Sequence, residues 1–96
     1  MPVYIVASIK VEDWDEYKKY QDGFLDIFTR YKGELLAVSD EPQVIEGEWP
    51  FTRAVIIRFP DEEEARRWYQ SPEYQALSQH RWRASKGAVI AFQGFA

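Results

Sequence analysis

The side chains that could carry acid–base or nucleophilic chemistry are few in this sequence. His80 is the only histidine, and there is no cysteine, which excludes a histidine-cluster metal site, a thiolate nucleophile and a disulfide framework. The ordinary pKa of a histidine suits proton transfer near neutrality. His80 is therefore a candidate catalytic residue, and the alternative is a partly solvated side chain on a helix. The glycines are scattered singly, so there is no phosphate or dinucleotide motif and we expect no cofactor.

Arg81 is the second candidate catalytic residue, because it shares one stripe of the last predicted helix with Tyr74 and Leu77. That spacing turns its guanidinium toward the core, where a buried charge needs a partner. Glu46 or an acid of the first helix could supply the partner in a structural ion pair; alternatively, Arg81 holds an anionic or carbonyl group of a small ligand. Tyr74 and the neighbouring Tyr69 are candidates for contacts to that ligand.

Four more side chains are candidates for ligand binding. Trp49 lies in a predicted loop, where no periodicity accounts for a large aromatic residue, and it either plugs the core or lines a pocket mouth or dimer seam. Tyr4, Ser8 and Arg58 fall on one face of the predicted strands. Hydroxyl and guanidinium groups on an otherwise apolar wall are typical of a small-molecule pocket, and equally of a hydrated dimer interface.

The elements that position these residues follow from the spacing of the apolar residues. Strict alternation predicts strands, and recurrence at every third or fourth position between Asp13 and Gly33 predicts a long first helix, loosened at Gly23. The predicted strands are Val3–Val11, Glu34–Ser39, Ala54–Phe59 and Ala88–Phe95, with a short edge segment at Gln43–Glu46.

A two-part helical corner is expected between residues 61 and 75. Pro60 ends the third strand and Asp61 caps a helix. Ser71 followed by Pro72 then restarts the chain as a second helix, which we expect to end at Gly87. Large aromatic side chains concentrate at this corner, so we expect it to roof the core.

The order of the elements is β-α-β-β-α-β within one domain, residues 1–96. It predicts an α+β, ferredoxin-like fold, in which an antiparallel sheet carries both helices on one face. Both alternating sets of every strand contain apolar residues, so the second face of the sheet needs a cover as well. Because no third helix is predicted, we expect a homodimer joined through the sheet faces, with roughly 800 Å² buried per partner.

The net charge of −4 argues against nucleic acids and anionic membranes as partners, since phosphate binding needs a basic surface. No apolar stretch is long enough to span a membrane, and no basic leader precedes the first strand. We therefore expect a cytoplasmic protein whose partners are a second copy of itself and a small apolar or aromatic molecule.

Several strings resemble the family of the domain of unknown function 1330. They are Val11–Tyr17 with Tyr20, Ile45–Trp49, Arg53 ahead of a β-branched strand that ends in Phe59-Pro60, and above all Trp68–Gln75 with Arg81. The resemblance covers nearly the whole chain. It implies the dimeric α/β-barrel fold that is shared with cofactor-independent monooxygenases, muconolactone isomerases and stress-responsive barrel proteins, and it brings no assigned reaction. Lys32-Gly33 and the turn at 39–42 depart from glycine-rich segments that are common in the family.

Two functions of different classes are consistent with these residues. The first is a cofactor-independent enzyme of the monooxygenase or isomerase kind, in which an apolar cavity desolvates an aromatic or lactone-like substrate. A tyrosine, His80 or Arg81 would then steer protons and developing negative charge. The second is a non-catalytic or stress-responsive dimer that binds a small apolar molecule. A purely structural dimer without a cavity is a third reading.

Overall fold

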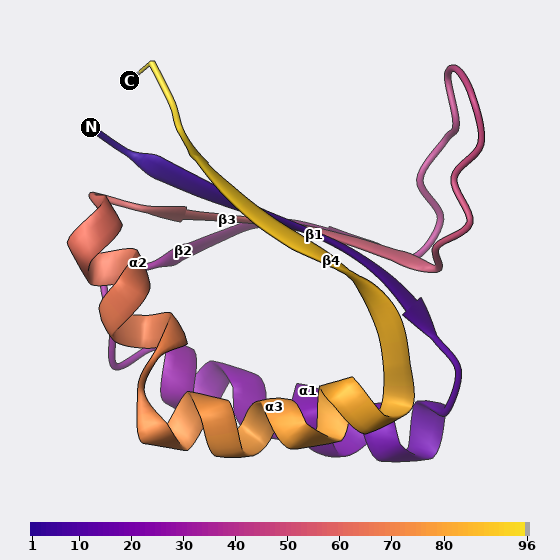
Figure 1. Cartoon of the computed structure of the whole chain (residues 1–96), viewed down its shortest axis with the longest axis horizontal. Coiled ribbons are helices and arrows are strands. Elements are labelled where there is room, and N and C mark those ends of the chain that lie inside the picture. The colour runs from indigo at the N-terminus through magenta and orange to yellow at the C-terminus, as the bar shows by residue number, and fades with distance from the viewer. Residues whose placement is uncertain (96) are drawn as a thin grey trace.

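A computed structural model of the chain describes residues 1–95. Its elements are β1 (Val3–Val11), α1 (Trp14–Phe28), β2 (Glu34–Ser39), β3 (Arg53–Phe59), α2 (Glu62–Tyr69), α3 (Pro72–Ala84) and β4 (Ser85–Gln93). The strands form one antiparallel sheet in the order β2-β3-β1-β4. All three helices lie on the same side of this sheet (Figure 1). The predicted α+β, ferredoxin-like arrangement is thus confirmed.

The sheet has an inner face toward the helices and an outer face on the other side. Along β1 every second side chain, from Val3 to Val11, is buried against the helices. The register places Ile57 of β3 opposite Ile5 on the inner face, whereas Ile56 is paired with Val6 on the outer face. Consecutive residues of one strand therefore meet two different environments, as the two-residue period of a strand requires.

Each helix begins directly after the residue that the sequence predicted as its N-cap. The carboxylates of Asp13 and Asp61 accept hydrogen bonds from the backbone N–H groups three residues later, and the hydroxyl of Ser71 accepts from the N–H of Tyr74. Such caps satisfy N–H groups that have no partner within the helix. The helical corner does roof the core: Trp68 is buried there and packs against the rings of Phe59 and Tyr74.

The joint between α3 and β4 differs from the prediction. The helix ends at Ala84 and β4 starts at the next residue without a loop. The N–H groups of Glu12 and Asp13 donate to the carbonyl of Ala84, and the hydroxyl of Ser85 donates to the carbonyl of Arg81. These bonds satisfy the last carbonyls of the helix, so that it needs no glycine to end.

Gly87 is therefore not the residue that ends the helix; it lies inside β4, opposite Ile9 of β1. A Cβ atom at position 87 would stand only 2.1 Å from the backbone oxygen of Ser8. The close approach of two strand backbones is what requires glycine here.

Four more elements differ from those predicted. Helix α1 ends at Phe28, before Gly33, and it runs without interruption through Gly23, whose bare backbone lets Leu77 of α3 pack closely. No strand forms at 43–46; residues 40–52 instead make a long loop, here called the arm, that rises from the sheet on the side away from the helices (Figure 1). Strand β3 begins at Arg53, and β4 covers Ser85–Gln93.

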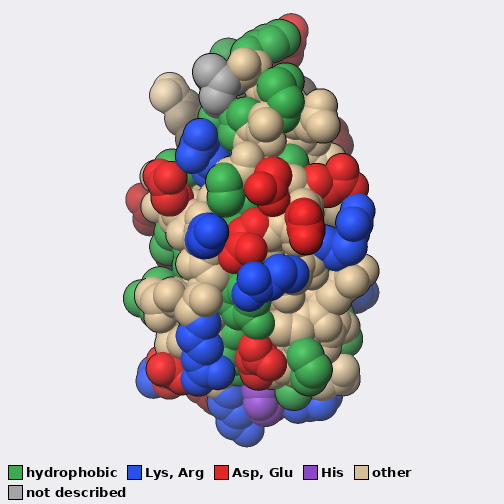
Figure 2. Space-filling view, turned by 90° about the vertical axis from the view of Figure 1, so that its left-hand side faces the viewer, with side chains coloured by type: hydrophobic (Ala, Val, Ile, Leu, Met, Phe, Trp, Pro, Cys, Tyr) green, Lys and Arg blue, Asp and Glu red, His purple; other side chains and the backbone are tan. Residues whose placement is uncertain are grey.

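The surface on the side that carries α2 mixes charges of both signs. Acidic and basic side chains lie next to each other there (Figure 2), and several form i,i+4 or i,i+3 pairs such as Glu62 with Arg66. Within residues 1–95, none of the helices has the length and apolar character that crossing a membrane requires.

Candidate functional site

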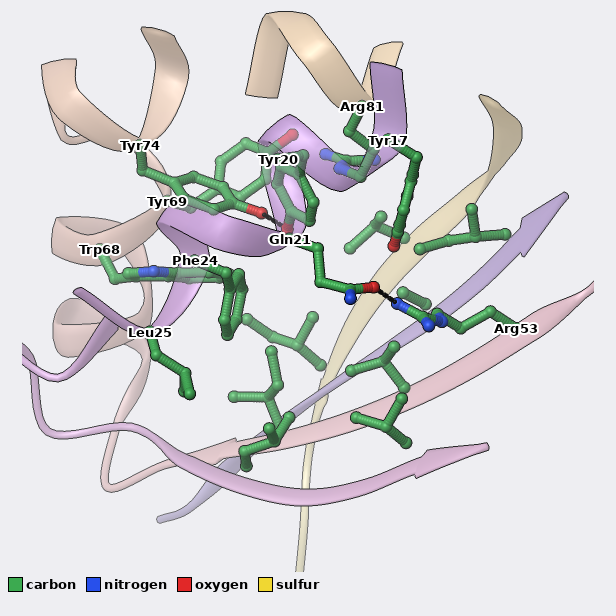
Figure 3. Close-up of a pocket in the computed structure, with 18 residues that line it drawn as sticks. Tyr17, Tyr20, Gln21, Phe24, Leu25, Arg53, Trp68, Tyr69, Tyr74 and Arg81 are labelled. Carbon is green, nitrogen blue, oxygen red and sulfur yellow. Dashed lines mark hydrogen bonds between the residues drawn. The ribbon is translucent and has the colours of Figure 1, made fainter. Parts of the chain in front are cut away.

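A cavity of about 330 Å³ lies between the inner face of the sheet and the helices. Its walls are largely apolar: aliphatic side chains of β1, β2 and β3 form one side, and aromatic side chains of the helices form the other (Figure 3). The residues with polar groups other than the indole of Trp68 that line it are Tyr17, Tyr20, Gln21, Arg53, Tyr69, Tyr74 and Arg81. Mostly apolar walls with a few converging polar groups are typical of small-molecule sites.

Two tyrosines on different helices form a hydrogen-bonded pair at this cavity. The hydroxyl oxygens of Tyr20 on α1 and Tyr74 on α3 lie 2.7 Å apart (Figure 3). Burial, and next the neighbouring Tyr74, raise the pKa of Tyr20 well above its ordinary value of 10. Tyr20 therefore keeps its proton near neutrality and acts as a hydrogen-bond group, not as a base.

Arg81 lies beside this pair and is only 8% exposed. Its guanidinium stands over the rings of Tyr20, at 5.5 Å, and Trp82, at 6.0 Å, a cation–π arrangement. Burial opposes the charge of Arg81, but the surrounding tyrosines, Tyr74 first, hold its pKa above the ordinary value. Arg81 is therefore a permanent cation in a largely apolar wall.

The predicted carboxylate partner of Arg81 is not found. Within residues 1–95 no carboxylate lies within 4.0 Å of its guanidinium, and no side chain accepts a hydrogen bond from it. Glu46 lies in the exposed arm, which rises on the side of the sheet away from the helices (Figure 1). Among the acids of α1, Glu16 contacts His80 and Arg83 instead, and Asp15, Asp22 and Asp26 are exposed to solvent.

Arg53, at the start of β3, reaches the cavity from the sheet side. It is held by the carboxylate of Asp40, at 2.6 and 3.1 Å, and it donates to the side-chain oxygen of Gln21 at 2.7 Å (Figure 3). The hydrogen bonds from Arg53 lower the pKa of Asp40, and the same contact raises the pKa of Arg53. Unlike Arg81, this cation has its countercharge within the chain.

The structure brings three of the predicted site residues together at the cavity: Tyr69, Tyr74 and Arg81. His80 lies elsewhere, on the side of α3 that faces away from the sheet. Its Nδ1 contacts the carboxylate of Glu16, which also accepts from Arg83. The hydrogen bonds from His80 and Arg83 lower the pKa of Glu16 to about 2. A catalytic role for His80 stays a prediction, and it would act outside this cavity.

The other predicted ligand-binding residues also lie outside the cavity. Tyr4, Ser8 and Arg58 share the outer face of the sheet, as their spacing predicted, and Arg58 pairs with Glu34. Trp49 is half-buried in the arm, where its ring packs edge-on against Phe51. Ligand binding by these four residues stays a prediction, and it concerns the side of the sheet that the helices do not cover.

Sequence reasoning did not single out Gln21, Arg53, Tyr17 or Tyr20 as residues of the cavity. One partial signal was present: alternation groups Arg53 with Val55 and Ile57 on one face of the strand. Gln21 carried no signal, because a glutamine next to a buried tyrosine on a helix is ordinarily solvated.

The outer face of the sheet is rich in exposed apolar side chains. Ile90 and Phe92 of β4 are 55% and 50% exposed, and Ile56 of β3 lies on the same face. The arm rises on this side of the sheet (Figure 1) and carries Val44 and Ile45, both exposed. Contiguous apolar surface of this kind marks a site of association.

No cluster of three or more acidic, histidine or cysteine ligands suited to a metal ion is present in the described part of the chain. What the cavity offers is apolar volume together with hydrogen-bond donors: the guanidinium of Arg81 and the tyrosine hydroxyls. Such groups can bind a molecule and stabilise negative charge on one of its oxygens.

The comparisons with known proteins agree with this fold. The family model of a domain of unknown function (DUF1330) matches residues 2–95. None of the curated proteins matches the sequence.

Among solved structures, a protein of unknown function from Rhodopseudomonas palustris has a TM-score of 0.81 at 14% identity, over 99% of this chain and 83% of that one. SnoaB, a cofactor-independent oxygenase from Streptomyces nogalater, has a TM-score of 0.72 at 14% identity, over 99% and 94%. A dimeric ferredoxin-like protein of unknown function from Bacteroides fragilis has a TM-score of 0.70 at 11% identity, over 97% and 96%. At these identities the likeness shows the fold alone.

Proposed function

Because the chain belongs to the DUF1330 family, a domain of unknown function, we propose its function from the cavity: each subunit of a homodimer binds one small, largely apolar molecule between its helices and its sheet. The observation that carries this proposal is the cavity itself, closed on one side by aliphatic strand residues and on the other by aromatic helix residues. Its volume of about 330 Å³ falls within the range of small-molecule sites.

Binding is favoured over catalysis by a protein base. The residues that line the cavity, among those the structure describes, include no aspartate, glutamate or histidine. Burial raises the pKa of Tyr20 and of Tyr17, so these two side chains keep their protons near neutrality. Shape and burial of apolar surface are enough for a binding protein, whereas an enzyme that removes a proton needs a titrating group in reach of its substrate.

A cofactor-independent enzyme is the second candidate, and one observation favours it. Arg81 and the Tyr20–Tyr74 pair converge at one place, where they would stabilise negative charge that develops on a substrate oxygen. The fold shared with the cofactor-independent oxygenase SnoaB supports this reading as an analogy only.

The homodimer is proposed to form through the outer faces of two sheets. The support is the exposed apolar surface around Ile90 and Phe92, the arm that rises on the same side (Figure 1), and the description of similar proteins from Bacteroides fragilis and Thermobifida fusca as dimeric. An interface of roughly 800 Å² per subunit would be ordinary for a stable dimer.

Native mass spectrometry of the protein as purified from cells tests both parts at once. We expect twice the mass of the chain plus the mass of one retained small molecule per subunit. A bare monomer at micromolar concentration would contradict the dimer. A dimer that carries no extra mass, and that no member of a panel of small apolar compounds saturates in calorimetric titrations, would contradict the binding function.

A cavity-filling variant locates the retained molecule. Val55 lines the cavity from β3, so Val55→Trp should displace the molecule and lower its occupancy at least about tenfold, through a clash with the added ring. Ala76→Trp, at an exposed position of α3, adds an indole outside the cavity and should leave the occupancy unchanged. Equal loss in both variants would contradict binding in this cavity.

A further inference from the structure

We propose that the molecule bound in the cavity is an organic anion, with an apolar ring system and one carboxylate, enolate or phenolate oxygen that sits at Arg81. This inference rests on the proposed binding function and adds the chemical class of the ligand. It follows from the charges around the cavity, because the chain supplies a buried cation there and leaves it without a countercharge.

Arg81 differs from every other arginine in the described part of the chain. Each of the others has a carboxylate within 4.0 Å; these arginines are Arg30, Arg53, Arg58, Arg66, Arg67 and Arg83. Arg81 has none, although its 8% exposure makes it the one arginine among residues 1–95 that counts as buried. The cation–π contacts with Tyr20 and Trp82 compensate the charge of Arg81 only in part, so the arrangement favours an anion from outside the chain.

The hydrogen-bonding groups beside Arg81 point to the same class of ligand. The hydroxyls of Tyr20 and Tyr74 hold two protons between them, and the bond that joins them uses one. Neither hydroxyl has a second partner within residues 1–95, so the pair retains one O–H that can donate to a ligand. A guanidinium and a free O–H are both donors, and an anionic oxygen accepts from both.

The remaining walls define the rest of the molecule. Arg81 lies beside Tyr17 and Tyr20 at one end of the cavity, while Phe24, Leu25 and Trp68 lie away from it (Figure 3). A second hollow shares Tyr69 and Arg81 with the cavity and continues toward Trp82 and the start of β4, so that solvent molecules and ligands can reach the guanidinium. The ligand is therefore amphiphilic, with its acidic end at Arg81 and its ring system among the aromatic side chains.

Matched pairs of probes test this assignment on the intact protein. We would titrate it by calorimetry with 2-naphthoate against 2-naphthamide, with 1-naphthoate against 1-naphthamide, and with benzoate against benzamide. Each acid and its amide have nearly the same shape and differ in charge. A charge-assisted hydrogen bond should make an acid bind at least about tenfold more tightly than its amide.

The same titrations on variants identify the cation. Arg81→Met should abolish the preference for the acid while the amide still binds, and Arg81→Lys should keep part of it. Arg66→Met removes the same charge from an exposed site on α2 and should leave the preference intact. Arg81→Met also removes the contacts of the guanidinium with the rings of Tyr20 and Trp82, so the preference of the unaltered protein serves as a criterion that does not depend on any variant.

Each outcome has one meaning. If acid and amide bind equally tightly to the unaltered protein, the ligand class is wrong and the binding function stands. If an acid is preferred and Arg81→Met keeps that preference, the assignment to Arg81 is wrong. If no probe of any pair binds at millimolar concentration and the purified protein carries no ligand, the binding function itself is overturned.

Discussion

Both faces of the sheet carry large apolar side chains, but the surroundings of the two faces are opposite. Ile57 is 4% exposed on the inner face, and its neighbour Ile56 is 37% exposed on the outer one. The helices of the chain cover the inner face and leave room for a cavity lined by donors, whereas nothing in the described chain covers the outer face. The apolar content of a strand face therefore does not tell whether that face lies in the core, in an interface or at a binding site. These cases differ in which element covers the face and in which polar groups lie beside it.

The first way to test this difference removes one large ring from each face. Phe59 is fully buried between Phe28 and Trp68, so Phe59→Ala should lower the free energy of unfolding by roughly 3–5 kcal/mol. Phe92→Ala removes the same ring from the outer face, where the single chain leaves half of it exposed, and it should lower the free energy of unfolding of the monomer by much less. Urea denaturation at one fixed protein concentration, low enough to keep the chain monomeric, measures both; equal losses would mean that the two faces contribute equally to the stability of the single chain.

A charge placed on the outer face tests whether that face forms the dimer. Ile90→Lys should weaken association by about 2 kcal/mol or more, roughly thirtyfold in the dissociation constant, because it desolvates an ammonium in an apolar interface. Sedimentation equilibrium measures the change. Ala76→Lys puts the same charge on the exposed side of α3 and should leave association as it is. A dimer that tolerates Ile90→Lys would have to form through another surface.

On the inner side, the tyrosine pair can be broken without changing the shape of the core. Tyr74→Phe removes the hydrogen bond to Tyr20 and should cost about 1 kcal/mol of unfolding free energy, as is usual for a buried neutral hydrogen bond. Tyr69→Phe is the matched control, since the hydroxyl of Tyr69 makes no hydrogen bond within residues 1–95, and it should cost less. Urea denaturation compares the two, and an equal loss in both variants would contradict a stabilising hydrogen bond between Tyr20 and Tyr74.

The smallest effect is expected on the solvent side of the helices, which belongs to neither face. The pKa of Glu16 is lowered from 4.5 to about 2 in the folded protein. The folded state therefore prefers the carboxylate, and this contribution to stability is present above pH 4.5 and is lost as the pH falls toward 2. Urea midpoints at pH 5 and pH 2.5 should differ less in Glu16→Gln than in the unaltered protein. Glu63→Gln, an exposed acid, should not alter the difference.

Most of the fold could be predicted from local signals. The alternation from Val3 to Val11 marks β1 with its exact bounds, and Asp13, Asp61 and Ser71 mark the helix starts because short polar side chains there bond to free backbone N–H groups. The family and the antiparallel sheet were predicted correctly as well.

The prediction erred where a distant contact decides the local structure. Gly87 suggested the end of a helix, but a glycine required by close approach of Ser8 looks the same in the sequence. The apolar pair Val44 and Ile45 suggested an edge strand, but it lies in the arm, away from any strand that could pair with it. Both errors come from interactions between residues far apart along the chain.

The candidate site was predictable only on the helix side. Helical spacing places Tyr74 and Arg81 on the same side of α3, the side that packs on the core, so both were predicted as site residues. Whether Tyr4 and Arg58 face a cavity or a partner depends on which face of the sheet the helices cover. The sequence pattern does not indicate that face when both faces carry apolar residues. For the same reason, the alternation that groups Arg53 with Val55 and Ile57 could not tell that this face lines the cavity.

The direct joint between α3 and β4 places Arg81 close to the point where the helix becomes a strand. Helix and edge strand meet at Ala84 and Ser85 with no loop between them, and the hydroxyl of Ser85 is bonded to the carbonyl of Arg81 itself. Arg81 lies about one helical turn before this joint, and β4 continues from it to Ile90 and Phe92 on the outer face. One continuous stretch of hydrogen-bonded backbone therefore connects the cation at the cavity with the exposed apolar side chains on the opposite side of the sheet.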